Sequence, residues 1–323
     1  MNILGIETSC DETSAAVVKG GKVILSNIVA SSLEDHKKYG GIIPEIASRR
    51  QMESINAVVN TSLKKSAVSM DKIHGIAVTG TPGLIGSLLV GLSFARALSF
   101  ALKKPLIEMD HITAHLYANF LKDASSKKTM LPPPKLPAIG LVVSGGHSGL
   151  YFIRNFKNVK LLGQTRDDAA GEAFDKVARI LGLGYPGGPI IDKKASGGTC
   201  GSLRFPQATL EGSFDFSFSG VKTAVLYYFQ KNGNKSDFNI DNVANAFQNS
   251  VVSILVKKSI KACQQKGVRT LLVGGGVAAN SALRARLASA AKSHNINVFF
   301  PPLNLCVDNA AMIAGLAYHY LKK

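Results

Sequence analysis

The sequence predicts an α/β protein built from two similar halves. Each half begins with short apolar runs of β-forming residues joined by tight turns, which is typical of an antiparallel hairpin sheet. Each half then alternates single strands with longer segments of helical periodicity, which is typical of β–α units. The segment 4–9 precedes the first hairpin as the segment 141–148 precedes the second, so the order of elements is repeated. A chain of 323 residues is long enough for two such domains.

The first half contains a clear hairpin signal followed by β–α units. Gly20 and Gly21 separate two apolar runs, and a Gly-Gly link of this kind favours a two-residue turn. We therefore expect strands over residues 2–6, 15–19 and 22–28, a helix over 44–65, a strand over 75–78, a helix over 83–103 and a strand over 106–109.

The second half repeats this order after a loop at residues 124–136. The stretch 186–219 is rich in glycine and polar residues, lacks clear periodicity, and is predicted to be an insertion. We expect strands over 138–143, 149–154 and 159–164, followed by strands over 270–273 and 297–299 that alternate with helices.

The predicted domains are residues 1–130 and 131–308, with a C-terminal helix at about 309–323 that could pack back on the first domain. This duplicated layout resembles the actin, Hsp70 and sugar-kinase (ASKHA) superfamily. Members of that superfamily hold a nucleotide in the cleft between two like domains, so the resemblance implies a nucleotide site. The alternative is that two generic hairpin sheets arose independently.

The charge balance favours a polyanionic partner. The chain has 38 Lys and Arg residues against 21 Asp and Glu residues, which gives a net charge of +17 and a pI near 9.7. Such an excess is typical of proteins that bind nucleic acid. Much of it lies in lysine doublets spread along the chain, without an RNA-binding module signature, so charge alone does not identify the polyanion.

Cysteine usage and hydropathy indicate a cytoplasmic protein. The four cysteines are scattered and form no C-x-x-C pair, which favours reduced thiols and offers no strong candidate nucleophile. The start of the sequence runs directly into a strand without a basic region or a long apolar leader. We expect no membrane partner, because no stretch approaches the uninterrupted apolar length of a membrane helix.

Two histidines point to a metal site. His111 and His115 follow the apolar run 105–109, and Asp110 is a plausible N-cap for a helix that opens at His111. Side chains four residues apart project from one helical face, so the two imidazoles can converge on one ion. Imidazole ligands suit zinc or ferrous iron better than magnesium. The alternative is that both histidines merely flank the start of a helix.

Glycine-rich turns at two strand ends suggest an anion or nucleotide site. The first runs from Val143 through Ser144, Gly145 and Gly146 to His147, and the second covers residues 273–280, ending at Asn280. Glycines at such turns expose backbone N–H groups that can bind phosphate, especially where a helix begins. Either turn alone is a weak signal, but together they favour a nucleotide site.

Two aspartates have both a structural and a functional interpretation. Asp175 lies in the helical segment 171–176, where it could bind ribose hydroxyls or belong to a solvated helix face. Asp308 is predicted to be the N-cap of the last helix, and capping alone would explain its identity. In a two-domain cleft, however, Asp308 would also complete a His-His-Asp metal site with open positions for substrate.

The chain resembles the TsaD family, the tRNA N6-adenosine threonylcarbamoyltransferase subunits once described as O-sialoglycoprotein endopeptidases, and specifically its bacterial members. Two departures stand out: Thr81 lies where the family usually has glycine, and Gln51 where histidine is common. Neither removes a proposed ligand. The matching segments span the chain and are residues 5–14, 39–45, 82–87, 111–115, 144–147, 171–176, 185–189, 274–280 and 308–314.

The resemblance implies an acyltransferase. Such an enzyme moves the threonylcarbamoyl group from threonylcarbamoyl-AMP to N6 of the adenosine 3′ to the anticodon, in tRNAs reading codons that begin with adenine. It implies one divalent metal per chain, Fe²⁺ in preference to Zn²⁺, held by His111, His115 and Asp308. Its partners would be the tRNA anticodon arm, a TsaB-like paralogue and a TsaE-like ATPase.

The resemblance also assigns roles to further residues. Asp11 and Glu12 are the candidate catalytic residues, although spacing does not assign which of them orients the nucleophile. The AMP portion would be bound by Val143, Ser144, Gly145, Gly146, His147, Asp175, Gly188, Asp192 and Asn280.

Other classes stay open at this stage. A metal-dependent protease is disfavoured because Ile112 stands where the general-base glutamate of H-E-x-x-H enzymes belongs. A small-molecule kinase of the same superfamily would need a phosphate loop and a catalytic aspartate, but no paired histidines. A non-catalytic scaffold should lack the metal ligands, and this chain keeps all three.

Overall fold

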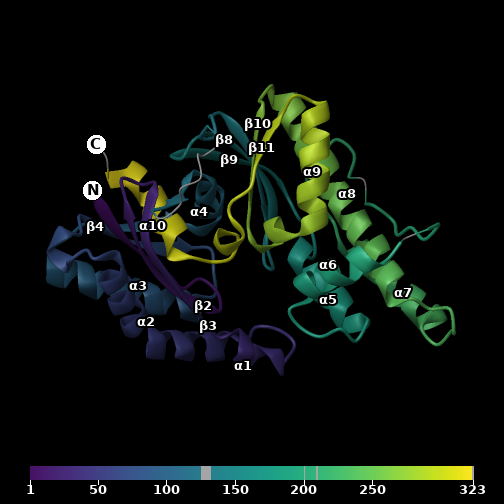
Figure 1. The fold of residues 1–323 in the computed structure, drawn as a ribbon, viewed down its shortest axis with the longest axis horizontal. Coiled ribbons are helices and arrows are strands. Elements are labelled where there is room, and N and C mark those ends of the chain that lie inside the picture. Colours follow the sequence, from purple (N-terminus) through teal and green to yellow (C-terminus); the bar gives the residue numbers. More distant parts are fainter. Residues whose placement is uncertain (125–131, 200, 209, 322–323) are drawn as a thin grey trace. The chain divides into compact units, whose positions relative to one another are not determined.

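The computed structural model describes residues 1–124, 132–199, 201–208 and 210–321, and the chain divides into two compact units. The first unit contains residues 1–134 and 301–323, and the second unit contains residues 135–300. Each unit is built on one mixed β-sheet with helices packed against it (Figure 1). Most of the predicted loop at 124–136 and Cys200 lie outside the described residues.

The first unit contains a six-stranded sheet in the order β5-β4-β1-β2-β3-β6. Gly20 and Gly21 form the predicted hairpin turn, with φ values of +61° and +71° that favour glycine. The three hairpin strands are antiparallel, and the remaining neighbours are parallel. The strands are β1 (Asn2–Glu7), β2 (Glu12–Lys19), β3 (Val23–Ser31), β4 (Gly75–Thr81), β5 (Leu106–Asp110) and β6 (Lys122–Asp123).

Alternation along β1 sends successive side chains to two different layers of helices. Leu4 and Ile6 pack into a core with α2 (Pro44–Ser66) and α3 (Ile85–Leu102), whereas Gly5 faces α10 (Ala310–Leu321). A Cβ atom at Gly5 would lie only 2.4 Å from the carbonyl oxygen of Ala310, so the close approach of α10 requires glycine there. The short helices α1 (Leu33–Lys37) and α4 (His111–Tyr117) complete this unit.

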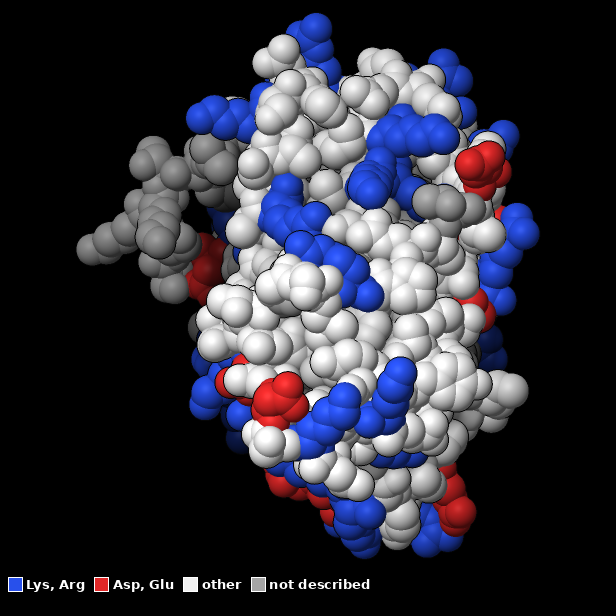
Figure 2. Space-filling view, turned by 90° about the vertical axis from the view of Figure 1, so that its right-hand side faces the viewer, with Lys and Arg blue, Asp and Glu red and all other residues white. Residues whose placement is uncertain are grey.

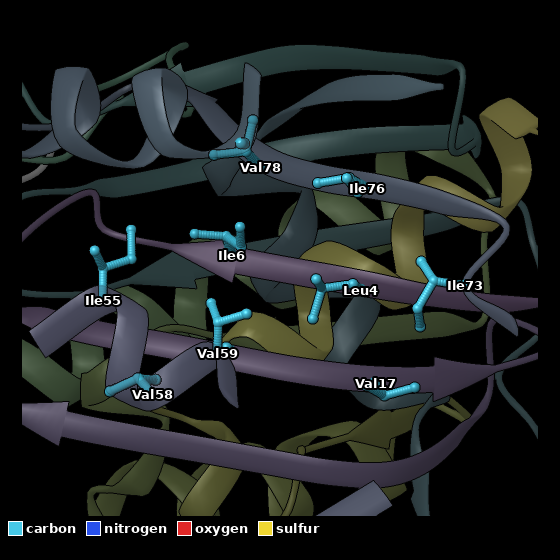
Figure 3. Close-up of a cluster of buried hydrophobic side chains, with 11 residues drawn as sticks. Leu4, Ile6, Val17, Ile55, Val58, Val59, Ile73, Ile76 and Val78 are labelled. Atoms are coloured by element: carbon cyan, nitrogen blue, oxygen red, sulfur yellow. The ribbon is translucent and has the colours of Figure 1, made fainter. Parts of the chain in front are cut away.

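One face of α2 carries a stripe of apolar side chains that pack into the core of the first unit. Ile55, Val58 and Val59 are buried against Leu4 and Val17 of the sheet (Figure 3). Removing apolar area of this kind from water contributes about 25 cal/mol per Å². The stripe therefore stabilises the first unit rather than serving as a free surface.

The second unit repeats the first with a five-stranded sheet in the order β11-β10-β7-β8-β9. In this sheet β11, β10 and β7 are parallel neighbours, and β7, β8 and β9 are antiparallel neighbours. The strands β5, β4, β1, β2 and β3 of the first sheet follow the same pattern, so the predicted duplication is confirmed. The strands are β7 (Ala138–Val143), β8 (Ser148–Asn155), β9 (Asn158–Gln164), β10 (Thr270–Gly274) and β11 (Asn297–Phe299). The helices are α5 (Ala170–Ile180), α6 (Gly187–Gly197), α7 (Ser219–Asn232), α8 (Ile240–Lys266) and α9 (Ser281–Ser293).

Three expectations need correction. The stretch 186–219 is not irregular throughout, because α6 lies within it and packs against α8 and α5. The segment 301–308 belongs to the first unit, so the division falls at residue 300 rather than at 308. The helix α3 is also long and apolar enough to cross a membrane by length and composition alone, which contradicts the expectation that no stretch is.

The packing of α3 shows how an apolar helix is used in this unit. Core helices of soluble proteins pass the same hydropathy test, and α3 contacts α2 and β4. Leu88 and Ala95 are buried on that side. The other side is open, with Ile85 79% and Phe100 88% exposed.

Candidate metal centre and nucleotide site

Local capping positions the two histidines at the end of β5. The Asp110 carboxylate accepts hydrogen bonds from the backbone N–H of Thr113 at 2.7 Å and from its hydroxyl at 2.6 Å, so Asp110 is the predicted N-cap of α4. His111 begins the helix and His115 follows one turn later, with both side chains buried. The helix start therefore directs both imidazoles to the same place.

Asp308 joins these histidines to form a possible metal site. The Nε2 atoms of His111 and His115 lie 3.1 Å apart, and Oδ1 of Asp308 lies 3.1 Å from Nε2 of His115 and 3.5 Å from Nε2 of His111. Tetrahedral ligands at about 2.0–2.1 Å from an ion are separated by roughly 3.3 Å. The donor set therefore fits one divalent transition metal and leaves coordination positions for substrate.

Asp308 is not the N-cap of the last helix, contrary to the sequence-based prediction. Its neighbour Asn309 accepts a hydrogen bond from the N–H of Met312 at 3.1 Å, and the N–H of Ala310 donates to the Ser14 hydroxyl at 2.8 Å. Because these bonds satisfy the start of α10, capping does not explain the identity of Asp308. Its carboxylate faces the two imidazoles instead.

Glu7, which was not predicted from the sequence, contacts the His111 ring at Nδ1, on the side away from the other two candidate ligands. Its Oε2 lies 3.1 Å from Nδ1 of His111 and accepts a hydrogen bond from the Thr79 hydroxyl, while Oε1 accepts from the N–H of Ser9. Burial acts to lower the pKa of His111, but the carboxylates of Asp308 and Glu7 outweigh burial and raise it to about 9. A metal ion binding here would displace that proton. A glutamate at the end of a buried apolar strand is the signal that could have identified Glu7.

The candidate catalytic carboxylates lie in the same unit. Burial, followed by the nearby carboxylates of Asp308 and Asp11, raises the pKa of Glu12 well above its usual value. Burial, followed by the carboxylates of Asp308 and Asp11, raises the pKa of the Cys10 thiol, which makes Cys10 a poor nucleophile. Glu12 therefore holds a proton more strongly than an exposed glutamate does.

Gln51 holds the turn that carries these acids. Its buried side-chain amide donates to the carbonyl oxygens of Cys10 at 2.8 Å and Glu12 at 3.0 Å. The departure from the family pattern at position 51 thus falls on a residue that supports the candidate catalytic residues. Thr81 is exposed at the end of β4, where its side chain has room.

In the second unit, two glycine-rich turns lie at the carboxyl ends of the neighbouring parallel strands β7 and β10. Gly275 has a φ of +90°, and a Cβ atom there would lie 2.3 Å from the carbonyl oxygen of Val143, so only glycine allows this contact. The turn after Val143 is closed by the N–H of Ser144, which donates to the carbonyl of His147 at 2.8 Å. Gly145 and Gly146 are exposed and face open space.

The remaining predicted residues hold the starts of helices around these turns. The Asp175 carboxylate accepts from the N–H of Gly187 at 2.7 Å, and burial raises its pKa. Both oxygens of Asp192 accept hydrogen bonds from Ser281, at 2.9 and 2.8 Å. Asn280 caps α9 through the N–H of Leu283 at 2.9 Å.

These contacts sort the predicted residues into two groups. His111, His115 and Asp308 meet in the first unit, with Asp11 and Glu12 near them. The predicted AMP-binding residues all belong to the second unit. There, Gly188 faces open space and belongs with Asp175 and Asp192 to the region of α5 and α6.

The two mixed sheets and their duplicated strand order define an ASKHA-type α/β fold. The activator component A of (R)-2-hydroxyglutaryl-CoA dehydratase from Acidaminococcus fermentans matches with a TM-score of 0.54 and 15% identity, over 100% of both chains. The ROK hexokinase from Thermus thermophilus matches with a TM-score of 0.52 and 16% identity, over 100% of this chain and 99% of that one. These likenesses confirm the predicted fold class.

Sequence comparison then identifies the family. The model of the tRNA N6-adenosine threonylcarbamoyltransferase family, TsaD, matches residues 23–315. The tRNA N6-adenosine threonylcarbamoyltransferase of Symbiobacterium thermophilum is 51% identical over 317 residues, which cover 98% of this chain and 91% of that protein. The chain belongs to the TsaD family.

We predict that the three-residue donor set controls metal content. His115→Ala and Asp308→Ala should each abolish binding of about one ion per chain, because two remaining ligands hold a divalent ion weakly. Metal analysis of purified protein measures this, and His294→Ala, an exposed histidine of the second unit, is the control. Full metal content in a folded Asp308→Ala protein would contradict the assignment.

A second prediction concerns the residue behind the ligands. Glu7→Gln should weaken metal affinity by about 10- to 100-fold while all three ligands remain, because the carboxylate orients the His111 ring. Competition with a chelator measures the affinity. Glu53→Gln, which removes an exposed carboxylate from α2, should leave it unchanged, and equal affinities for the two variants would refute the role of Glu7.

Proposed function

We propose that this chain transfers the threonylcarbamoyl group from threonylcarbamoyl-AMP to N6 of the adenosine 3′ to the anticodon, in tRNAs that read codons beginning with adenine. Membership of the TsaD family carries the proposal, because the family match covers most of the chain and curated relatives about half identical to it share one activity. The convergence of three donor atoms in the first unit is the structural observation that supports it.

The proposed role of the first unit is to hold the acyl end of the donor. A divalent ion bound by His111, His115 and Asp308 would act as a Lewis acid toward the threonylcarbamoyl carbonyl. We propose Fe²⁺ in preference to Zn²⁺, because two imidazoles and one carboxylate with open positions form the common ligand set of non-haem iron. Glu7 would fix the orientation of the His111 ring.

The proposed role of the second unit is to hold the adenylate. The N–H of Gly171, at the start of α5, donates to the carbonyl of Ser144 at 3.1 Å, so the open turn at Gly145 and Gly146 adjoins a helix N-terminus. Such a position favours phosphate. Asp175 and Asp192 would accept ribose hydroxyls with lone pairs that their present hydrogen bonds leave available.

The transfer step needs a proton acceptor. The N6 amine would attack the acyl carbon, the bond from that carbon to the phosphate oxygen would break, and AMP would leave with the bonding electrons. The proton lost from N6 would pass to Glu12 or Asp11. The raised pKa of Glu12 supports it for this role, because a carboxylate with a higher pKa is a stronger proton acceptor.

We predict that adenylate binding and metal binding respond to different substitutions. Asp175→Ala and Asn280→Ala should each weaken affinity for AMP by about tenfold, because a hydrogen bond and the local helix start are lost. Calorimetry measures the affinity, and metal content should remain that of the wild type. Asn234→Ala, at an exposed position after α7, is the control. Unchanged AMP affinity in both test variants would argue against this site.

The first unit also offers a surface for the proposed TsaB-like paralogue. Ile85, Leu89 and Phe100 are exposed on α3, and Met52 is 62% exposed on α2. Large apolar side chains exposed on neighbouring helices are typical of association surfaces. We propose that the paralogue covers this side of α3, and that the TsaE-like ATPase acts on the resulting complex in the cytoplasm.

We predict that the isolated chain binds the adenylate but modifies tRNA poorly. Addition of the paralogue, the ATPase and ATP should restore repeated turnover, measured as modified nucleoside by mass spectrometry. Leu89→Glu should prevent that restoration without changing metal content, because a buried charge at an apolar interface is strongly unfavourable. Robust multiple turnover by the chain alone at physiological salt would contradict the partner requirement.

A further inference from the structure

A basic groove lies in the second unit, away from the turns that form the candidate nucleotide site. It has a volume of about 520 Å³ and is bounded by the segment 203–206 and by α7 with the turn that follows it. Its basic side chains are Arg204, Lys231 and Lys235, all of them exposed. Among the residues that the structure describes, no carboxylate lines the groove.

The floor of the groove is a fixed aromatic cluster. The rings of Phe205 and Tyr228 make an edge-to-face contact with centroids 5.8 Å apart, and Tyr228 also contacts Phe238. The hydroxyl of Ser250 on α8 donates to the carbonyl of Phe205 at 3.0 Å, which anchors the segment that carries Arg204. The groove is therefore held open by packing within the second unit.

Helical spacing places the side chains that line the groove on one side of α7. Ala224, Tyr227, Tyr228 and Lys231 are separated by three, one and three residues, so they line one face. Tyr227 is 65% exposed, so its ring is available at the rim of the groove. Lys231 and Lys235 form no ion pair within the described part of the chain. An exposed aromatic ring beside unpaired ammonium groups is an arrangement that binds nucleic acid.

We propose that this groove binds the tRNA substrate, with Lys231 and Lys235 contacting phosphates and Tyr227 stacking on an unpaired base. The inference rests on the proposed function, which supplies RNA as the polyanion. It is supported by the net charge of +17 and by the many Lys and Arg side chains on this side of the second unit, with fewer Asp and Glu side chains among them (Figure 2). An acidic protein partner would match the positive charge of the groove, but its binding would not require the exposed aromatic ring of Tyr227.

The experiment measures binding of an unmodified tRNA transcript to the full chain over a series of salt concentrations. Lys231→Gln together with Lys235→Gln should raise Kd about tenfold and reduce the slope of log K against log salt by about 1.5, because two phosphate contacts are lost. The control is Lys64→Gln with Lys65→Gln on α2, which removes the same charge from two exposed positions of the first unit. Its slope should remain that of the wild type.

A second pair of variants tests stacking. Tyr227→Ala should weaken tRNA binding at least fivefold, whereas Tyr227→Phe should bind as the wild type does, because stacking needs the ring and not the hydroxyl. Because Tyr227 is exposed, neither substitution should change the melting temperature, and this measurement checks that both variants are folded. In the complete enzyme system the lysine variant should raise KM for tRNA and leave kcat and AMP affinity unchanged.

The outcomes separate this proposal from the proposed function. Wild-type Kd and slope in both the lysine variant and Tyr227→Ala would overturn the groove assignment, even if the enzyme modifies tRNA normally. Loss of affinity for a protein partner together with unchanged tRNA binding would also overturn it, and would assign the groove to that protein. Failure of the wild-type system to modify tRNA would contradict the proposed function, while the binding measurement would still test the groove.

Discussion

The candidate metal site of the first unit depends on the contact between Glu7 and His111. A carboxylate that is completely buried on a strand is costly unless charged or hydrogen-bonding groups surround it. Thr79 and Ser9 donate to Glu7, and His111 supplies the compensating charge. Because each of these groups satisfies another, removal of one partner from such a buried pair typically costs about 3–5 kcal/mol. The same contact aims Nε2 of His111 at His115 and Asp308.

This arrangement also requires the chain to return to the first unit at its end. The segment 301–308 brings Asp308 to the histidines, and α10 then packs directly against β1. That packing is possible because Gly5 leaves space for the backbone of Ala310. The third ligand is thus delivered by a contact between residues about three hundred positions apart in the sequence. A bulkier residue at position 5 would act on the metal site through α10 without touching any ligand.

The features that could be predicted from the sequence are those that depend on residues close together in the chain. The turn at Gly20 and Gly21 and the cap at Asp110 are decided by a few neighbouring residues, and both are predictable. The place of Glu7 at the end of an apolar strand can be seen in the sequence, but its partners Thr79 and His111 come from other segments, and no local pattern shows that they meet. At the last helix two adjacent residues could both cap, and the choice of Asn309 over Asp308 is made by tertiary contacts. The glycine and polar residues of α6 likewise gave no helical pattern in the sequence, because packing against α8 stabilises this helix.

The contrast in burial between the two groups of residues fits the different demands of the two ends of an acyl-adenylate. His111 and His115 are almost fully buried, and in such surroundings a fixed charge acts more strongly on a carbonyl than it would in water. Gly145 and Gly146 are exposed and present backbone groups to open space, which suits a phosphate that must leave as AMP after each reaction. The duplicated fold therefore gives two similar sheets whose strand ends differ in polarity and exposure, and the proposed division of roles between the two units rests on that difference.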